Sequence, residues 1–429
     1  RSPHRISWHG ETAGTSMSAT TPAQMAAEQL AEGTVATAAP AVPAPPRIRS
    51  VDLMRGIVMI IMTIDHARDY YSPYPYDPTD LSQASPWLFL TRWITHFCAP
   101  TFMFLAGTSA FLYARNTGAS RGQLQRFLLS RGLWLVFLEL TWVSFCWRFD
   151  FHGTILQVIW ALGWCMVILA GLLWLPRRAI AAVGLAAVFG HNLLDGIHLD
   201  AAAQYGEGAA VAWSVLHQFH FFVLPSGYSI ALGYPLLPWF GVMALGYCFG
   251  DLLMLPAPQR DRWMLRIGLA AIVLFLLLRL GNVYGEARLW QHNPRGLLYT
   301  ALGVLNVTKY PPSLLYLLMT LGPVLLLLPL LERARGAWTA RVAVFGRVPM
   351  FFYLLHLPLL HLGSYLIWLE LYGITRQPFG DDPLPAAYQP SLWYLYAAWA
   401  VVVLLLYPVC RWYAGYKSRN KQMWWLSYL

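Results

Sequence analysis

Six Asp, Arg and His side chains are concentrated in one otherwise apolar segment near the start of the sequence, SVDLMRGIVMIIMTIDHARDYY (residues 50–71). They are Asp52, Arg55, Asp65, His66, Arg68 and Asp69. Ionisable groups on an apolar helix usually face the protein interior or a water-filled cavity. An imidazole close to a carboxylate can move a proton, so this segment is a candidate for general acid–base chemistry.

One face of the helix predicted over this segment gathers most of these groups. Residues spaced alternately three and four apart share a helical face. The residues with this spacing are Asp52, Arg55, Met59, Met62, His66 and Asp69. We call this face the polar stripe. Charged groups lie towards both of its ends and two methionines lie in its middle, which predicts two separated half-sites.

His66 is the candidate general base. Asp69 lies one helical turn further on, where its carboxylate could orient the imidazole; Asp65 is a weaker catalytic candidate because it falls on another face. Arg55 lies about 16 Å from His66 along the helix, towards the opposite end of the polar stripe. Structural alternatives remain open: an Asp52–Arg55 pair that anchors the helix, or a His66 that only stabilises the bundle.

Three further residues are candidates for lining a cavity. His96, Glu139 and His356 each lie within a long apolar segment elsewhere in the sequence. A purely structural role for His96 is an equal alternative. His356 and His361 are five residues apart, which is unsuited to chelation on one helical face, and no metal-binding motif occurs. We therefore predict that the protein binds no metal.

The composition places these residues in a membrane protein. The chain is 57% hydrophobic and 12% charged, whereas soluble domains are about 25% charged. Apolar runs close to the ~20 residues that cross a bilayer recur along the chain. We predict an all-α, polytopic bundle of about ten transmembrane helices, at residues 50–70, 87–113, 127–147, 154–175, 178–194, 234–255, 264–281, 311–331, 346–371 and 392–412.

The distribution of charge predicts the orientation of the bundle. With the N-terminus in the cytoplasm, most of the 30 Lys and Arg residues fall on cytoplasmic flanks, and most acids fall on the opposite flanks. This asymmetry follows the positive-inside rule and places both termini in the cytoplasm. The same asymmetry accounts for the net charge of +10. We therefore predict the lipid bilayer as a partner and exclude nucleic acid as one.

Three regions divide the sequence. Residues 1–46 are rich in Ala and Pro and are predicted to be disordered. Residues 47–415 form the transmembrane domain, and residues 416–429 form a basic, aromatic cytoplasmic tail. Two long outer connections, 191–233 and 282–310, are rich in His, Trp, Tyr and Asn. Long ordered loops are often binding surfaces.

Several segments resemble a bacterial family of membrane proteins that groups with the catalytic domain of heparan-alpha-glucosaminide N-acetyltransferase. They are RIRSVDLMRGIVMIIMTIDHARDY, FMFLAGTSAFLY, GTILQVIWALGWCMVILA, YPLLPWFGVMALGY, KYPPSLLYLLMTLGP and GRVPMFFYLLHLPLLH. The spacing of Arg55 and His66 is also similar to the first-helix motif of membrane acyltransferases that O-acylate glycans. In the heparan enzyme the catalytic histidine lies in the loop after this helix, but the loop SPYPYDPTDLSQASPW contains no histidine.

The resemblance implies transmembrane acyl transfer by a multi-pass protein of the bacterial cytoplasmic (inner) membrane. The donor would be acyl-CoA, expected to be acetyl-CoA, held from the cytoplasmic side by Arg55 with Arg126 or Arg131. The acceptor would be a carbohydrate hydroxyl or amine on the outer side, deprotonated by His66 with Asp69 as orienting group. Because the loop histidine is missing, glucosamine of heparan sulfate is not carried over as the acceptor.

Two other classes of protein remain alternatives. A proton-coupled transporter would use the polar stripe as a relay, and Glu139 in the middle of its helix is compatible with that function. The methionines in the middle of the stripe favour two half-sites over a continuous relay. A binding or scaffold protein would not need an ordered polar stripe. The sequence is compatible with a homo-oligomer.

Overall fold

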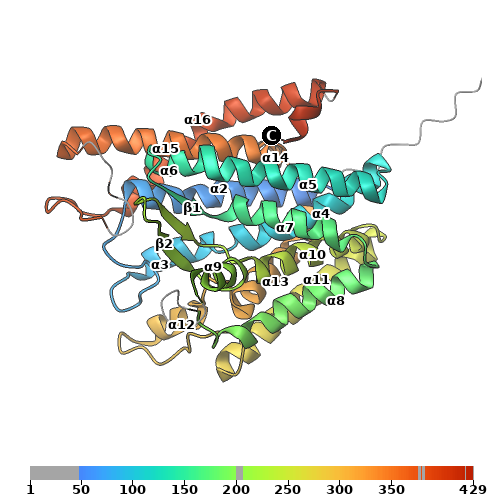
Figure 1. Ribbon diagram of the computed structural model, residues 1–429, viewed down its shortest axis with the longest axis horizontal. Coiled ribbons are helices and arrows are strands. Elements are labelled where there is room, and N and C mark those ends of the chain that lie inside the picture. Colours follow the sequence, from blue (N-terminus) through green and yellow to red (C-terminus); the bar gives the residue numbers. More distant parts are fainter. Residues whose placement is uncertain (1–47, 200–205, 375–377, 379–381, 421, 429) are drawn as a thin grey trace, which may run out of the picture. The chain divides into compact units, whose positions relative to one another are not determined.

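The computed structural model describes residues 48–429 except 200–205, 375–377, 379–381, 421 and 429 (Figure 1). The predicted disorder of residues 1–46 falls outside the described residues. The described part is mostly helical, as the sequence predicts. Its helices are α2 (Arg49–Tyr71), α3 (Pro86–Thr95), α4 (Cys98–Thr117), α5 (Arg121–Leu138), α6 (Ser144–Arg148), α7 (Val158–Leu172), α8 (Arg177–Gly190), α9 (Gly206–Leu216), α10 (Leu236–Leu253), α11 (Ala257–Gly281), α12 (Leu297–Leu305), α13 (Leu314–Arg333), α14 (Ala337–Arg347), α15 (Pro349–Tyr372) and α16 (Leu392–Arg419).

Seven helical segments of the described chain are long and apolar enough to cross a membrane. They are 86–117 (α3 with α4), 121–148 (α5 with α6), α10, α11, α13, α15 and α16. The predicted spans 178–194 and 154–175 correspond to α8 and α7, which have only 14 and 15 residues. The span 50–70 corresponds to the longer but strongly charged α2. The chain is an integral membrane protein, and the count of ten remains a prediction.

A small three-stranded sheet interrupts the helices at one end of the bundle. Strand β3 (Ser229–Leu232) pairs in parallel with β1 (Gly153–Leu156) and antiparallel with β2 (His220–Val223). The prediction that a helix starts at residue 154 is therefore wrong, because residues 153–156 are hydrogen-bonded to a strand. Since β2 and β3 lie in the connection 191–233, this connection contributes ordered structure to the bundle.

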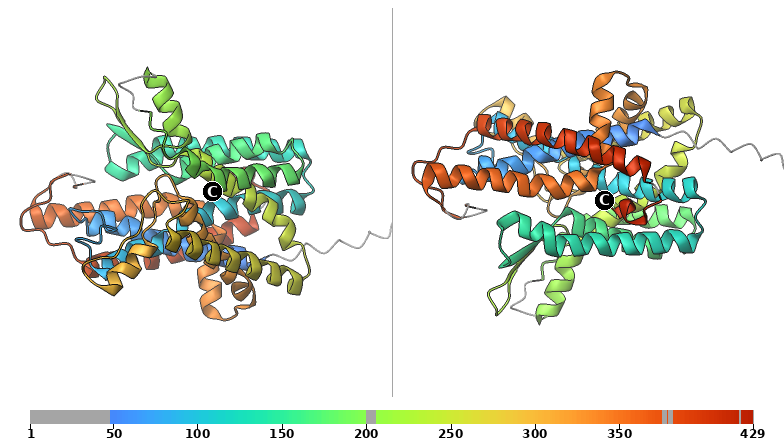
Figure 2. Two further views of the ribbon diagram at one scale, coloured as in Figure 1. Left: turned by 90° about the horizontal axis from the view of Figure 1, so that it is seen from below. Right: turned by 90° about the horizontal axis from the view of Figure 1, so that it is seen from above.

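Helix α2 lies among helices from both halves of the chain. It packs against α3, α4, α13, α14, α15 and α16 (Figures 1 and 2). The approach of α14 is especially close, because a Cβ atom added to Gly346 would collide with the backbone carbonyl of Asp52. Because α2 is buried on several sides, its apolar residues pack against other helices instead of following a lipid-facing periodicity. Its charged residues face other protein groups for the same reason.

The C-terminal helix α16 continues past the predicted domain boundary at residue 415 and ends at Arg419. A short 3₁₀ helix at Trp424–Tyr428 follows it. The Tyr428 hydroxyl lies 2.8 Å from the hydroxyl of Ser130 on α5. The predicted tail therefore begins within a helix and returns to pack against the bundle.

Candidate active site

His66 and His356 form a hydrogen-bonded pair between two helices that are far apart in the sequence. His66 lies on α2 and His356 on α15, and the distance from His66 Nδ1 to His356 Nε2 is 2.7 Å. Both imidazoles are buried, and the two rings are stacked. His356, a cavity candidate in the sequence, is thus the direct partner of the candidate base.

Backbone carbonyl groups determine the tautomer of His356. Its Nδ1 atom lies 2.7 Å from the carbonyl oxygen of Tyr353 and 3.3 Å from that of Phe352. A carbonyl oxygen can only accept, so this Nδ1 carries the proton, and in a neutral ring Nε2 is then an acceptor. His66 Nδ1 must donate to it. With both rings neutral, Nε2 of His66 is left unprotonated, which is the state that a general base requires.

Asp69 does not make the contact with His66 that the polar stripe predicts. Its Oδ1 atom accepts a hydrogen bond of 2.5 Å from the adjacent Arg68. The Nδ1 atom of His66 is directed to His356 instead. The contact that orients the imidazole is therefore made by His356 on another helix, and Asp69 orients Arg68.

Asp65 lies at the centre of a buried cluster of charges. Its carboxylate pairs with Arg92 and, at 2.7 Å, with Arg68, and the Lys309 ammonium lies 3.9 Å away. Asp65 thus lines the same cavity as His66, although helical phase places it off the polar stripe. Both of its oxygen atoms face cations, which suits an electrostatic role better than proton transfer.

A cavity of about 300 Å³ lies beside His66 and Asp69. We call it the His66 cavity. Strands β1 and β3 contribute Ile155 and Ala231 to its wall, and Lys309 and Tyr310 come from the connection before α13. Its other polar or aromatic lining residues are Asp65, His66, Arg68, Asp69, Arg92, Thr95, Phe102, Trp147, Gln157, Phe219 and Tyr234. The small sheet and a loop thus close the bundle around the candidate base.

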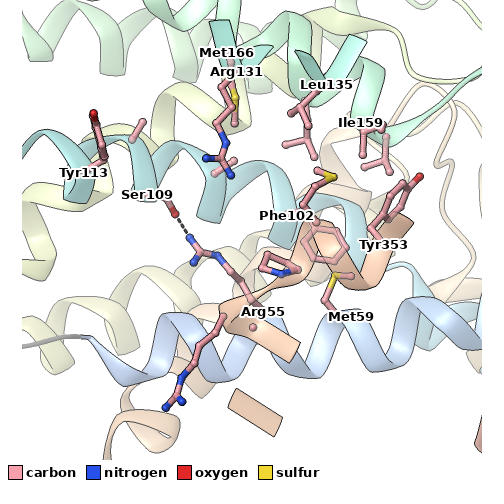
Figure 3. Close-up of a pocket in the computed structure, with 18 of the residues that line it drawn as sticks. Arg55, Met59, Phe102, Ser109, Tyr113, Arg131, Leu135, Ile159, Met166 and Tyr353 are labelled. Carbon is pink, nitrogen blue, oxygen red and sulfur yellow. Dashed lines mark hydrogen bonds between the residues drawn. The ribbon is translucent and has the colours of Figure 1, made fainter. Parts of the chain in front are cut away.

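A second cavity, of about 340 Å³, lies beside the first half of α2 (Figure 3). We call it the Arg55 cavity. Figure 3 shows Arg55 from α2 and Arg131 from α5 extending into the same space. Its charged lining residues are Asp52, Arg55, Arg131, Arg347 and Lys417. Four of these five are basic, so the cavity can bind an anion such as a phosphate.

Neighbouring groups fix the position of Arg55. Its guanidinium donates to the Ser109 hydroxyl and, at 3.3 Å, to the Leu105 carbonyl, and it lies 3.8 Å from the Asp52 carboxylate. The Asp52–Arg55 pair that could merely anchor the helix is therefore present. It lies in the wall of the Arg55 cavity, so anchoring and anion binding are compatible.

Phe102 and Val158 line both cavities. The Arg55 cavity ends on α2 at Met59 and the His66 cavity begins at Met62, one turn further on. The polar stripe therefore faces two adjoining half-sites separated by apolar side chains, as the spacing predicts. This arrangement suits two molecules that meet at the junction, and it interrupts a proton relay along the helix.

Four of the predicted site residues are absent from the lining of both cavities in the described part of the chain. One of them is His356, which contacts His66 but does not line a cavity as predicted. Arg126 is exposed and bonds to the Gly122 carbonyl of its own helix. His96 is buried, and its ring packs edge-on against Tyr316. Glu139 is fully buried in a π-helical turn, and its carboxylate accepts from the backbone N–H of Trp160 at 3.0 Å. It therefore caps the first turn of α7, a structural role.

Four basic lining residues were missed by the sequence prediction. Arg92 and Lys309 line the His66 cavity, and Arg347 and Lys417 line the Arg55 cavity. The sequence gives one indication of a binding role for Lys309, because this residue lies at the end of the connection 282–310, which is predicted to be a binding surface. Arg92 and Arg347 lie in or beside apolar segments, where a snorkelling role is the ordinary interpretation. Lys417 lies in the basic tail, where no site residue is predicted.

The fold and the site define a helical membrane protein with two adjoining polar cavities. Residues 47–282 match the family described as heparan-alpha-glucosaminide N-acetyltransferase, catalytic. The match covers more than half of the chain, and the chain belongs to this family, which confirms the resemblance noted in the sequence. A search of curated proteins found no match. His66, Arg55 and Arg92 lie within the matched region, whereas Lys309 and His356 lie beyond it.

Proposed function

We propose that this protein transfers an acyl group from acyl-CoA, with acetyl-CoA as the expected donor, to a hydroxyl or amine of a sugar. The observation that carries the proposal is the hydrogen bond between His66 and His356, because it leaves Nε2 of a neutral His66 unprotonated. His66 lines a cavity that adjoins a basic one. The family match supports an acetyltransferase type of enzyme. The family match does not favour the alternative function, a proton-coupled transporter.

In this proposal the Arg55 cavity holds the donor. Arg55, Arg131 and Lys417 would neutralise its phosphates, and the apolar remainder of the lining would cover its thioester arm. The extended arm would cover most of the about 16 Å towards His66. By the predicted orientation, this cavity opens to the cytoplasm and the His66 cavity to the outer side.

The reaction takes place where the cavities adjoin. His66 Nε2 accepts the proton of the acceptor O–H or N–H while the acceptor atom attacks the thioester carbonyl carbon. The tetrahedral intermediate then collapses, the C–S bond breaks, and the CoA sulfur leaves and takes the proton from His66. His356 keeps the imidazole in the tautomer that this cycle needs.

The proposal is tested with purified full-length protein, radiolabelled acetyl-CoA and a panel of amino sugars and polysaccharide fragments. Wild type should release CoA and label an acceptor. His66→Ala should lose turnover and still bind CoA, whereas His152→Ala, at a histidine side chain that is 88% exposed, should keep the wild-type rate. Absence of CoA binding by wild type would refute acyl transfer.

A further inference from the structure

The charges that line the His66 cavity do not cancel. Its lining contains three basic side chains, Arg68, Arg92 and Lys309, and two carboxylates, Asp65 and Asp69. With His66 neutral, the described lining therefore has a net charge of one positive unit. An isolated charge in a low-dielectric site is costly unless a counter-ion accompanies it.

The three cations are paired to different extents. Arg68 contacts both carboxylates, at 2.7 Å from Asp65 and 2.5 Å from Asp69. Arg92 pairs with Asp65. Lys309 lies 3.9 Å from the same carboxylate, which is too long for a charge-assisted hydrogen bond. The surplus charge of the cavity is therefore centred on Lys309.

The surroundings of Lys309 are those of a binding residue. Only 9% of its side chain is exposed, and its ammonium lies 5.1 Å from the centre of the Tyr310 ring. Burial raises the pKa of the Tyr310 phenol, but the positive charges of Lys309 and Arg92 outweigh burial and leave the pKa below its ordinary value. The neighbouring phenol therefore experiences a positive potential that the carboxylates have not cancelled.

We infer that the acceptor of this enzyme is an anionic sugar, and that Lys309 binds its carboxylate or phosphate while a hydroxyl or amine of the same sugar lies beside His66. The inference rests on the proposed acyl transfer. Lys309 and His66 line one cavity of about 300 Å³, which suits a single sugar unit. Tyr310, Tyr234 and Gln157 add the aromatic and amide groups that bind a sugar ring.

The test compares three probes with the same ring: glucosamine, glucosamine 6-phosphate and glucosaminuronic acid. Binding is measured by titration calorimetry and acyl transfer by transfer of label from acetyl-CoA. Wild type should bind and acylate at least one anionic probe about tenfold or more better than glucosamine, because a charge-assisted hydrogen bond discriminates by that order. The two anionic arms show whether the group is a carboxylate or a phosphate.

Lys309→Met removes the charge at similar length, and Lys309→Arg retains it. The methionine variant should bind all three probes with similar affinity, because only the affinity for the two anionic probes falls relative to wild type. The arginine variant should recover part of the preference for anionic probes. Equal binding of the three probes by wild type would overturn the inference, as would an equal loss for all three in Lys309→Met. A third outcome would be that wild type binds an anionic probe preferentially but transfers no acyl group to any probe. That result would refute the proposed reaction and would still support an anion-binding site at Lys309.

Discussion

The hydrogen bond of 2.7 Å between Nδ1 of His66 and Nε2 of His356 links the first long helix of the described chain to α15. It reverses the expected arrangement, in which a carboxylate on the same helix orients the base. Because the two carbonyl groups before His356 hold its proton on Nδ1, the direction of the pair is fixed. The free lone pair is placed on the nitrogen of His66 that can meet an acceptor.

Replacing His356 by Phe should lower kcat for acyl transfer about tenfold or more, because His66 loses the group that sets its tautomer. The KM for acetyl-CoA should change by less than about twofold, since the Arg55 cavity is untouched. His356→Gln can accept the same hydrogen bond through its side-chain oxygen and should restore part of the rate. A purely structural role would give parallel losses in both variants and in their melting temperatures.

Arg131 and Arg126 provide a matched pair on α5. Arg131→Ala should raise the KM for acetyl-CoA about tenfold, because it removes a cation that lines the Arg55 cavity. Arg126→Ala should have an effect of less than about twofold, since that side chain is exposed and apart from the described lining. Initial rates over a range of acetyl-CoA concentrations measure both. Equal effects would contradict the assignment of the donor to this cavity.

Phe102 lines both cavities, so a larger side chain there should obstruct the passage between them. Phe102→Trp is expected to lower kcat at least about tenfold, because misplacement of about 1 Å can cost that much. The affinity for desulfo-CoA, which lacks the thiol that would reach the junction, should fall much less than kcat, because the cations that bind the phosphates are unchanged. Phe137→Trp on α5, at a side chain that is 53% exposed, is the control. A wild-type rate for Phe102→Trp would show that the acyl group does not cross this junction.

Gly346→Ala should destabilise the contact between α14 and α2, because the added methyl group meets the backbone of Asp52 and Gly56. The expected cost is about 1–3 kcal/mol, the range for overpacking of a tight interior. Gly171→Ala in α7 meets no atom within 4 Å and should be neutral or slightly stabilising, because alanine favours a helix. Melting temperatures in one detergent compare the variants. A similar melting temperature for both would contradict the close packing.

The contribution of α2 to both half-sites could be predicted from the sequence, because helical periodicity alone places Arg55, Met59 and His66 on one face. Apolar runs likewise indicated the long helices, since the apolar length required by a bilayer is fixed. The partner of His66 could not be found in this way. His356 is 290 residues away in the sequence, and only the packing of α15 against α2 brings them together.

The interpretation of the acidic residues depended on the same missing information. Helical phase favoured Asp69 over Asp65 as the residue that contacts His66. It could not show that Arg68 pairs with Asp69, or that Arg92 and Lys309 lie beside Asp65.

Glu139 is a similar case. A carboxylate in the middle of an apolar run indicates a transport pathway, yet here it caps a neighbouring helix whose start could not be located from the sequence.

The role of His66 Nε2 as the base is tested by imidazole rescue. The rate of acyl transfer by His66→Ala would be measured with and without added imidazole, under saturating acetyl-CoA. We expect a loss of about 100-fold or more and a partial return of the rate that increases with imidazole concentration, because free imidazole can enter the vacated space. A His66→Ala enzyme that keeps the wild-type rate would show that His66 is not the base.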